Sequence, residues 1–421
     1  MEPIICVIAD DFTGAGDSAV QFGGVGKPVR LFLKEPPVSL GTWSLAAVVI
    51  DTDSRQARAD EAYKKVFSVG KTLCAAGANT FFKKIDSTMR GNPADEIAAL
   101  MDAAGYRIAV VAPSAPRNKR TVSGGICRIA GEPISTTSLS RDPFNPMTES
   151  RVSKLMERRF PNTVRELPLE LVRSGGESLN DKIRFETSHG ARVFVADAET
   201  MDDLKIVAGI NVPGGLLFAG SSGLAEAIAG NTVSEKPTLP RIPCGKAIFV
   251  IGSVTPTSAA QCGHLVKTGK VEEIVVDSGA ILANPDEEKR RVLGLVDTAP
   301  KSRALLLRTS GLDSAGSVDA SDKASGNAIS HFLSEVALAT AEFRKSRFLF
   351  ASGGDTAGKT AAAFGAVCID FVTEILPGLP FGYFRSSVFK RRMYFISKSG
   401  GFGDQDALAK ILSLVCAERK E

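Results

Sequence analysis

The sequence has few of the residues and patterns that several large functional classes require. Its 421 residues include only three histidines, His189, His264 and His331, and none of them is near another. A zinc site or a Ser-His-Asp triad is therefore poorly supported. The seven cysteines are scattered and never form a C-x-x-C pair, so we expect reduced cysteines in the core and a cytosolic setting.

Signals for membrane insertion and export are also missing. No segment approaches the ~18 uninterrupted apolar residues of a membrane-spanning helix, and the first residues lack the basic region of a signal peptide. The net charge of +4 has no long basic run behind it. It is compatible with small anionic substrates and gives no indication of nucleic-acid binding. We expect a cytoplasmic protein with neither a nucleic-acid nor a membrane partner.

Short apolar, β-branched runs alternate with helical patterns along the whole chain. This alternation predicts an α/β fold of two domains, each a mostly parallel sheet flanked by helices, with a ligand cleft between them. Two domains also suit the length, because single cores stop growing near ~250–300 residues. We place an N-terminal domain at residues 1–230, a proline-containing linker at 231–243 and a C-terminal domain at 244–421.

The most specific single motif is the glycine-rich stretch 352–360, which follows a short apolar strand. A strand, a glycine-rich turn and a helix N-terminus together form a phosphate site, because unpaired N–H groups point at the anion. Gly353, Gly358, Lys359 and Thr360 also satisfy the P-loop pattern. Only about 60 residues follow, too few for the remaining βα units of a P-loop fold. We predict phosphate binding without a P-loop fold, and contacts of Lys359 and Thr360 with phosphate stay open.

Two other turns of the C-terminal half are further candidates for lining the phosphate site. One follows the strand 247–251 and is rich in serine and threonine, which also commonly cap helices. The other follows the strand 393–396, is rich in glycine and contains a lysine as a candidate phosphate partner. The candidate nucleotide-binding residues are Ser253, Thr255, Gly353, Gly354, Asp355, Thr356, Gly378, Lys398, Gly400, Gly401 and Gly403.

The segment after the first N-terminal strand fits a dinucleotide-binding pattern, with a helix expected from about residue 19. The residues that fit it are Gly14, Gly16, Ala19 and the later acid Glu35. Asp10 and Asp11 argue against this function, because two carboxylates beside a pyrophosphate cost several kcal/mol at an effective dielectric of ~20. Carboxylates at this place suit hydroxyl groups, a cation or a metal better, and we favour polyol binding.

Another polar turn of the N-terminal half, 86–93, follows the strand 81–85. Two lysines, an acid, two hydroxyl side chains and Arg90 converge there, and open α/β sheets bind ligands at the carboxyl ends of their strands. We therefore expect a ligand-binding role for this turn. The basic loop 117–121 could hold a carboxylate or simply face solvent.

Six short segments, spanning both halves of the chain in order, resemble the four-carbon acid sugar kinase family. They are Ala9-Asp-Asp-Phe-Thr-Gly-Ala-Gly-Asp17, Lys83-Lys-Ile-Asp-Ser-Thr-Met-Arg-Gly91, Gly220-Ser-Ser-Gly-Leu-Ala225, Gly252-Ser253, Ser352-Gly-Gly-Asp-Thr356 and Lys398-Ser-Gly-Gly-Phe-Gly-Asp404. In one place the chain departs from the pattern: Lys119-Arg120-Thr121 stands where Gly-Arg-Thr is expected. This departure leaves the exact sugar acid open.

The resemblance implies ATP-dependent phosphorylation of a four-carbon sugar acid such as threonate, erythronate or an oxo-tetronate. The N-terminal domain would bind the sugar acid and the C-terminal domain the nucleotide, with Gly353 to Thr356 as the phosphate loop. Mg²⁺ would bridge the β- and γ-phosphates, and Asp355 and Asp404 are candidate ligands, although each could merely cap a helix. A homo-oligomer is left open.

Phosphoryl transfer needs mainly positioning and neutralisation of charge. Our hypothesis is that two cations pair with the substrate carboxylate, three acids bind its hydroxyls, and one of these acids or Asp17 accepts the proton of the attacking hydroxyl. The cations are Lys84 and Arg90, and the three acids are Asp10, Asp11 and Asp86. Two rival classes stay open. An NAD(P)-dependent oxidoreductase built on the Gly14 loop predicts NAD(P) binding, and a non-catalytic nucleotide-binding sensor predicts ATP binding without turnover.

Overall fold

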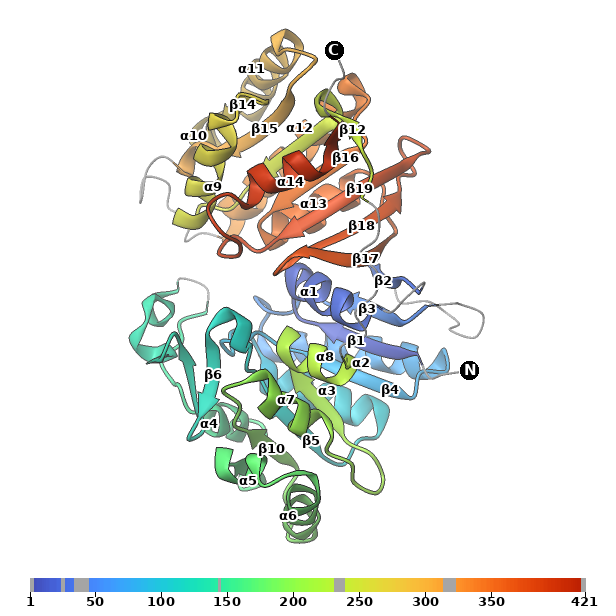
Figure 1. The fold of residues 1–421 in the computed structure, drawn as a ribbon, viewed down its shortest axis with the longest axis vertical. Coiled ribbons are helices and arrows are strands. Elements are labelled where there is room, and N and C mark those ends of the chain that lie inside the picture. The colour runs from blue at the N-terminus through green and yellow to red at the C-terminus, as the bar shows by residue number, and fades with distance from the viewer. Residues whose placement is uncertain are drawn as a thin grey trace. The chain divides into compact units, whose positions relative to one another are not determined.

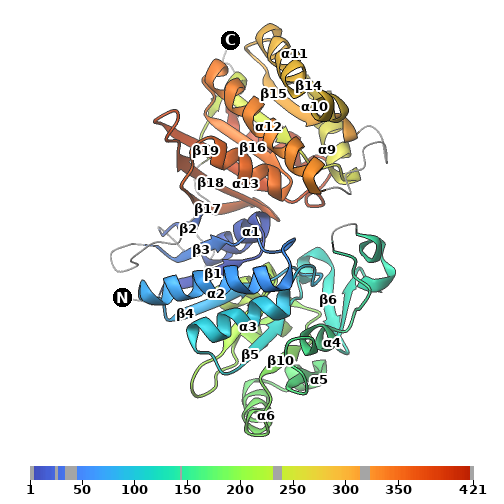
Figure 2. The ribbon, with the colours of Figure 1, turned by 180° about the vertical axis from the view of Figure 1, so that it is seen from behind.

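The structure is a computed structural model that describes residues 4–23, 27–33, 45–142, 145–230, 239–312 and 323–417. It divides into two compact units, Met1–Ser234 and Glu235–Glu421, which we describe separately (Figures 1 and 2). Residues 231–238 of the expected linker lie outside the described residues, and so does Glu35. Within the described part, no helix is both long and apolar enough to span a membrane.

The first unit contains one parallel sheet with the strand order β2-β3-β1-β4-β11-β5-β10-β9. Figure 1 shows α1, α7 and α8 on one face of this sheet, and Figure 2 shows α2 and α3 on the other. The strands are β1 (Ile5–Ala9), β2 (Val29–Phe32), β3 (Ala47–Asp51), β4 (Thr80–Lys84), β5 (Ala109–Ala112), β9 (Val164–Leu167), β10 (Val193–Ala196) and β11 (Leu217–Gly220). The helices are α1 (Phe12–Phe22), α2 (Ala59–Ala75), α3 (Pro93–Ala104), α4 (Val152–Glu157), α5 (Leu169–Arg173), α6 (Gly176–Ser188), α7 (Met201–Ala208) and α8 (Ser222–Ala229).

A small antiparallel sheet is inserted after β5. It consists of β6 (Arg120–Ser123), β7 (Ile126–Ile129) and β8 (Glu132–Pro133). The strands β6 and β7 form a β-hairpin. It places the start of β6 beside the turn that follows β4, where Arg120 donates a hydrogen bond to Ser87.

The second unit has the strand order β14-β15-β13-β16-β19-β18-β17, in which the pairs β19–β18 and β18–β17 are antiparallel and the other pairs are parallel. Its strands are β13 (Ala247–Ile251), β14 (Val271–Val276), β15 (Ala304–Thr309), β16 (Phe348–Ser352), β17 (Cys368–Leu376), β18 (Leu379–Arg385) and β19 (Arg392–Lys398), with the short pair β12 (Ile242–Pro243) and β20 (Cys416–Ala417). Its helices are α9 (Pro256–Lys267), α10 (Ser278–Ala283), α11 (Pro285–Thr298), α12 (Lys323–Arg344), α13 (Gly354–Ala363) and α14 (Ala407–Val415). The predicted α/β class with mostly parallel sheets is confirmed.

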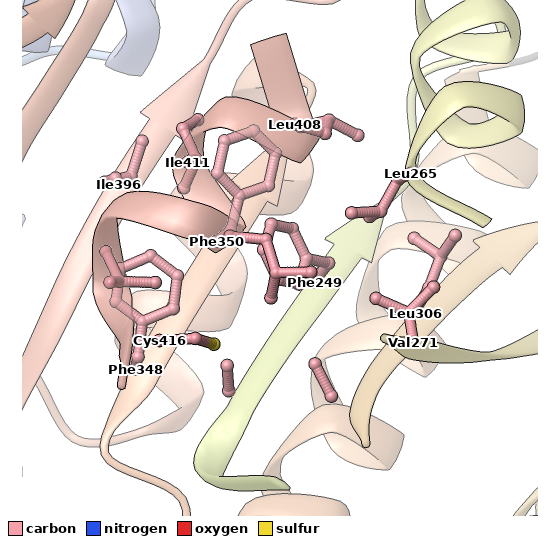
Figure 3. Close-up of a cluster of buried hydrophobic side chains, with 14 of the residues drawn as sticks. Phe249, Leu265, Val271, Leu306, Phe348, Phe350, Ile396, Leu408, Ile411 and Cys416 are labelled. Atoms are coloured by element: carbon pink, nitrogen blue, oxygen red, sulfur yellow. The ribbon is translucent and has the colours of Figure 1, made fainter. Parts of the chain in front are cut away.

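The core of the second unit lies between its central strands and the helices α9 and α14. Figure 3 shows Phe249, Phe348 and Phe350 of β13 and β16 beneath Leu408 and Ile411 of α14. The rings of Phe249 and Phe350 are 5.3 Å apart between centroids. This apolar layer fixes the positions at which β13, β16 and β19 end. All seven cysteines of the chain are free.

Candidate active site

In the first unit, Arg55 joins two acidic side chains that follow β1. Its Nε lies 2.7 Å from Asp10 Oδ2 and its Nη2 lies 3.0 Å from Asp10 Oδ1. The same guanidinium donates to both carboxylate oxygens of Asp11 at 2.7 Å. Burial favours the neutral form of Asp10, but the positive charges of Arg55 and Lys84 outweigh it and hold the pKa of Asp10 below its ordinary value.

Asp11 also caps α1, which begins directly after β1. Its Oδ1 accepts a hydrogen bond of 2.9 Å from the N–H of Gly14, and its Oδ2 accepts one of 2.7 Å from Thr13 Oγ1. The helix starts at Phe12, well before the expected start near residue 19, because the aspartate caps it by accepting the N–H of Gly14.

This early start of α1 overturns the dinucleotide-binding interpretation of its glycines. Gly14 lies inside the helix, and a Cβ atom there would lie 2.5 Å from Asp11 Oδ1 and 2.6 Å from Lys84 Nζ. The glycine therefore makes room for a carboxylate and an ammonium group of the protein. A pyrophosphate at this helix N-terminus would meet the carboxylate of Asp11, which already accepts the N–H of Gly14.

The turn after β4 is organised around Asp86. Its carboxylate accepts hydrogen bonds from Arg90 Nε at 2.8 Å and Arg90 Nη2 at 3.1 Å, and also from the hydroxyl of Thr88. Arg55 Nη2 lies 3.9 Å from Asp86 Oδ1, so one guanidinium links the two acidic turns. Burial opposes ionisation of Asp86, but the charges of Arg90 and Arg55 hold its pKa well below the ordinary value.

The two lysines of β4 point to opposite faces of the sheet, as successive residues of a strand do. Lys83 is fully buried, its Nζ lies 2.7 Å from Glu96 Oε2, and it donates to the carbonyl of Ile8 at 3.1 Å. Lys84 lies beside Asp11, acts by its charge on Asp10 and donates to the carbonyl of Ile85 at 2.8 Å; these acids and cations together are called the cluster below. The expectation that both lysines serve the ligand-binding turn is therefore wrong for Lys83, which neutralises a buried acid of α3.

Two further groups complete the cluster. Asp17 is buried on α1, and its charge acts on Arg120, whose Nη1 donates to Ser87 Oγ at 2.6 Å. Burial lowers the pKa of Arg120 below its ordinary value. Lys119 has a φ of 55°, a left-handed conformation that favours glycine, and this explains why the family pattern has glycine there.

The structure brings the six predicted catalytic residues to one edge of the first sheet, at the carboxyl ends of β1 and β4 and on α1. These residues are Asp10, Asp11, Asp17, Lys84, Asp86 and Arg90. Sequence reasoning missed Arg55, the residue that connects the two acidic turns. The available signal was the polar string Asp51-Thr52-Asp53-Ser54-Arg55 directly after an apolar strand.

In the second unit, three turns meet where β13, β16 and β19 end side by side. Thr255 caps α9 by accepting a hydrogen bond of 3.3 Å from the N–H of Ser258. Gly353 has a φ of 102° and precedes α13, which begins at Gly354. Two helix N-termini therefore lie at one sheet edge, the arrangement that favours an anion.

Close packing fixes these turns against one another. A Cβ atom at Gly252 would lie 2.0 Å from Thr356 Oγ1, and one at Gly400 would lie 2.1 Å from Ser253 Oγ. Thr255 Oγ1 donates to the carbonyl of Gly400 at 2.9 Å. The three segments form one continuous surface of small residues and backbone groups.

Lys398 has a different contact from the one expected of a phosphate partner. Its buried Nζ donates to the carbonyls of Ser399 at 2.8 Å, Gly400 at 2.9 Å and Phe402 at 3.1 Å. An ammonium group has three N–H donors, so all of them are used within the loop, and we correct the expectation of a direct phosphate contact. Burial lowers the pKa of Lys398 to about 8.

The remaining glycines of this edge have distinct surroundings. Gly378 has a φ of 75° in the turn between β17 and β18, and a Cβ atom there would lie 2.3 Å from the ring of Phe402. Gly403 has a φ of 80°. Gly401 is exposed and has no atom within 4 Å of a Cβ position. Gly378 therefore supports the loop rather than facing its open side.

Lys359 and Thr360, which complete the P-loop pattern, lie inside α13. Lys359 Nζ donates to Asn327 Oδ1 on α12 at 2.6 Å. Thr360 is buried, donates to the carbonyl of Thr356 at 2.6 Å and lies 3.2 Å from Ser334 Oγ on α12. In a P-loop these two side chains reach the phosphates and the metal, whereas here both contact a neighbouring helix.

Asp355 and Asp404 are both exposed on the described surface of this edge. Among the described residues, no group of three or more histidine, cysteine, aspartate or glutamate side chains is arranged to hold a metal ion.

Two protein-family models match the chain, one in each of its two units. Residues 5–228 match the family model of a sugar-binding N-terminal domain, and residues 248–408 match that of a nucleotide-binding C-terminal domain. The chain is 30% identical to a D-threonate kinase of Salmonella typhimurium over 98% of its own length and 99% of the relative's. It is 28% identical to a D-erythronate kinase of Heliobacterium modesticaldum, over 96% and 95% of the two chains. It is 27% identical to a 3-oxo-tetronate kinase of Pectobacterium atrosepticum, over 96% and 97%.

Solved structures share the fold. A protein from Salmonella typhimurium superposes with a TM-score of 0.81 at 24% identity, covering 97% of this chain and 98% of that one. A protein from Haemophilus influenzae superposes with a TM-score of 0.73 at 22% identity, covering 96% and 98%.

Proposed function

This chain belongs to the four-carbon acid sugar kinase family, and we propose that it transfers the γ-phosphoryl group of ATP to a hydroxyl group of a four-carbon sugar acid. Relatives that match it over nearly their full length are a D-threonate, a D-erythronate and a 3-oxo-tetronate kinase. The acceptor is therefore a four-carbon acid of this kind.

The observation that carries the proposal is the mixed cluster of acids and cations in the first unit. Asp10 and Asp86 have lowered pKa values, so both carboxylates are ionised at neutral pH and can accept hydrogen bonds from substrate hydroxyls. Lys84, Arg90 and Arg120 supply positive charge at the same edge for the substrate carboxylate. A site with both kinds of group fits a molecule that has a carboxylate and several hydroxyls.

We infer that the protein's own groups mainly position the acceptor. Asp10, Asp11 and Asp86 bind its hydroxyls, and one of them or Asp17 accepts the proton of the attacking hydroxyl. A carboxylate with a low pKa is a weak base, but phosphoryl transfer with a loose transition state needs little removal of the proton before the reaction. Lys84 and Arg90 contribute charge for the substrate carboxylate, although both already have a partner within the protein.

The second unit supplies the proposed nucleotide site. The N-termini of α9 and α13 and the loop 399–404, which contacts Thr255, offer backbone N–H groups and small residues to the phosphates. Asp355 and Asp404 fit Mg²⁺, because this ion is usually held by one or two carboxylates together with substrate phosphates. When bound, Mg²⁺ would supply positive charge that neutralises part of the charge of the phosphates. The seven free cysteines support the proposal of a cytoplasmic enzyme.

The test is a coupled assay of ADP release with Mg²⁺ and ATP against a panel of four-carbon sugar acids. Longer aldonates and neutral polyols serve as controls. We expect release with one or more of the four-carbon acids and none with the polyols. ATP binding without release for any acid would instead favour a nucleotide sensor, and NAD(P) binding without ATP binding would favour the oxidoreductase.

A further inference from the structure

The loop 399–404 of the second unit turns its carbonyl oxygens toward the protein. Lys398 Nζ binds the carbonyls of Ser399, Gly400 and Phe402, as described above. Gln261, which is fully buried on α9, also donates from Nε2 to carbonyl oxygens of this loop, two of which Lys398 does not contact. Its acceptors are the carbonyls of Phe402 at 3.0 Å, Gly403 at 3.1 Å and Asp404 at 2.9 Å.

The direction of these carbonyls determines where the N–H groups of the loop point. All peptide bonds among the described residues are trans, so each C=O is opposed in direction to the N–H of the next residue. The N–H groups of Gly400, Gly401, Gly403 and Asp404 therefore point away from Lys398 and Gln261. None of these four has a hydrogen-bond acceptor among the described residues. Successive unpaired N–H groups of this kind form a concave site for an anion.

The charge beneath the loop has the sign that an anion requires. The ammonium group of Lys398 is buried, and no acidic side chain forms an ion pair with it in the described part of the chain. Its positive charge is shared only with carbonyl dipoles, which polarises the same peptide groups whose N–H ends face outward. A buried cation with this environment is stabilised when a negatively charged phosphate occupies the outer side.

We propose that Lys398 and Gln261 are positioning residues for the nucleotide phosphates: by binding the loop carbonyls they hold the N–H groups of Gly400, Gly401 and Gly403 toward a phosphate group. Neither side chain touches the phosphate itself. This inference rests on the proposed nucleotide-binding function of the second unit. It assigns a role to Gln261, which lies outside all the glycine-rich turns.

The first experiment compares Lys398→Met and Gln261→Met with the wild type in steady-state kinetics. We expect the KM for ATP to rise roughly tenfold or more, because the lost hydrogen bonds orient the N–H groups of Gly400, Gly401 and Gly403, which we call the phosphate cradle. The KM for the sugar acid stays unchanged, since that site belongs to the first unit. Lys267→Met, an exposed lysine on the same helix as Gln261, is the matched control and leaves both constants unchanged. A wild-type KM for ATP in both test variants would overturn the proposal, and so would an equal rise of both KM values.

A second experiment on the wild type keeps the proposal testable even where a variant does not fold. Hydrogen–deuterium exchange of the peptide that spans residues 399–405 is measured with and without tripolyphosphate. We expect slower exchange with tripolyphosphate, because the outward N–H groups become hydrogen bonded, and unchanged exchange would overturn the proposal. Protection of the loop in a protein that releases no ADP would refute the kinase proposal while supporting the cradle.

Discussion

Arg55 holds Asp10 in a two-pronged contact, with Nε 2.7 Å from Oδ2 and Nη2 3.0 Å from Oδ1. The two residues come from different strand ends, and their contact depends on β3 lying beside β1 in the sheet. The same guanidinium reaches Asp11 and lies 3.9 Å from Asp86. The positions of Asp10 and Asp11 therefore depend on this arginine, which together with Lys84 also holds the pKa of Asp10 below its ordinary value.

Replacing Arg55 with methionine should reduce stability and activity together. A buried carboxylate would lose its counter-charge, which lowers the free energy of unfolding by about 3 kcal/mol. Because the pKa of Asp10 is lowered in the folded chain, the stabilisation is present above the unfolded pKa of about 4 and is lost as the pH falls below it. Urea unfolding at several pH values checks this. Arg58→Met, at an exposed ion pair, is the control, and a difference that stays constant down to acidic pH would contradict the pairing.

Replacing Asp86 with asparagine should reduce turnover by roughly 100-fold or more, whether it accepts the proton or holds the attacking hydroxyl. The affinity for ATP should not change, because the proposed nucleotide site is in the other unit. Calorimetric titration with ATP and the ADP-release assay measure the two effects. Asp102→Asn, on the exposed side of α3, serves as the control. Wild-type turnover in the Asp86 variant would remove this residue from the catalytic set.

Replacing Lys83 with methionine should affect stability and leave ligand binding to the remaining folded protein intact. The change leaves Glu96 buried without its cation and lowers the free energy of unfolding by about 3–5 kcal/mol. The double variant with Glu96→Gln should recover part of this loss, since no unpaired charge remains. Denaturant titration of the wild type and the two variants provides the measurement. A stable Lys83 variant with a raised KM for the sugar acid would show that this lysine serves the ligand after all.

Lys359→Met and Thr360→Val test whether the P-loop pattern is functional. Both side chains contact α12 in the structure, so the KM for ATP should stay within about twofold of the wild type, as for substitutions away from a site. A P-loop protein would lose most of its nucleotide affinity with either change. Nucleotide titration of the two variants separates these outcomes. A large loss of affinity in the lysine variant would restore the P-loop interpretation.

The affinity for ATP should fall as the pH rises through about 8. Burial lowers the pKa of Lys398 to about 8, and the titratable neighbour that acts on it is Cys262 of α9. Phosphate binding favours the protonated lysine, so deprotonation above this pH weakens the cradle. Without nucleotide, the free energy of unfolding changes in the opposite direction and rises with pH between about 8 and the usual lysine pKa. The reason is that the unfolded chain binds more protons than the folded one in this range. ATP titrations from pH 7 to 9, about one unit on either side, measure the step. Lys398→Met should abolish it, and an identical step in that variant would assign it to another group.

The sequence by itself determined the class of fold and the turns that are candidates for ligand binding. Apolar β-branched runs bounded by polar or glycine-rich turns predict parallel strands and mark their carboxyl ends, because both signals are local. The acidic turn after β1, the turn after β4 and the three turns of the second unit were all found in this way. The family resemblance added the type of reaction to these positions.

Only the tertiary structure decided which side chains meet at those positions. Arg55 reaches the acids because β3, β1 and β4 are neighbours in the sheet, and strand order is not contained in any local pattern. Lys83 and Lys84 are adjacent in sequence but face opposite sides of β4, so one neutralises Glu96 and the other joins the cluster. Lys359 contacts α12 because α13 begins at Gly354, so the residues that match a P-loop lie within a helix. Contacts between distant segments require the packed sheet and helices, and a single sequence specifies them only through that packing.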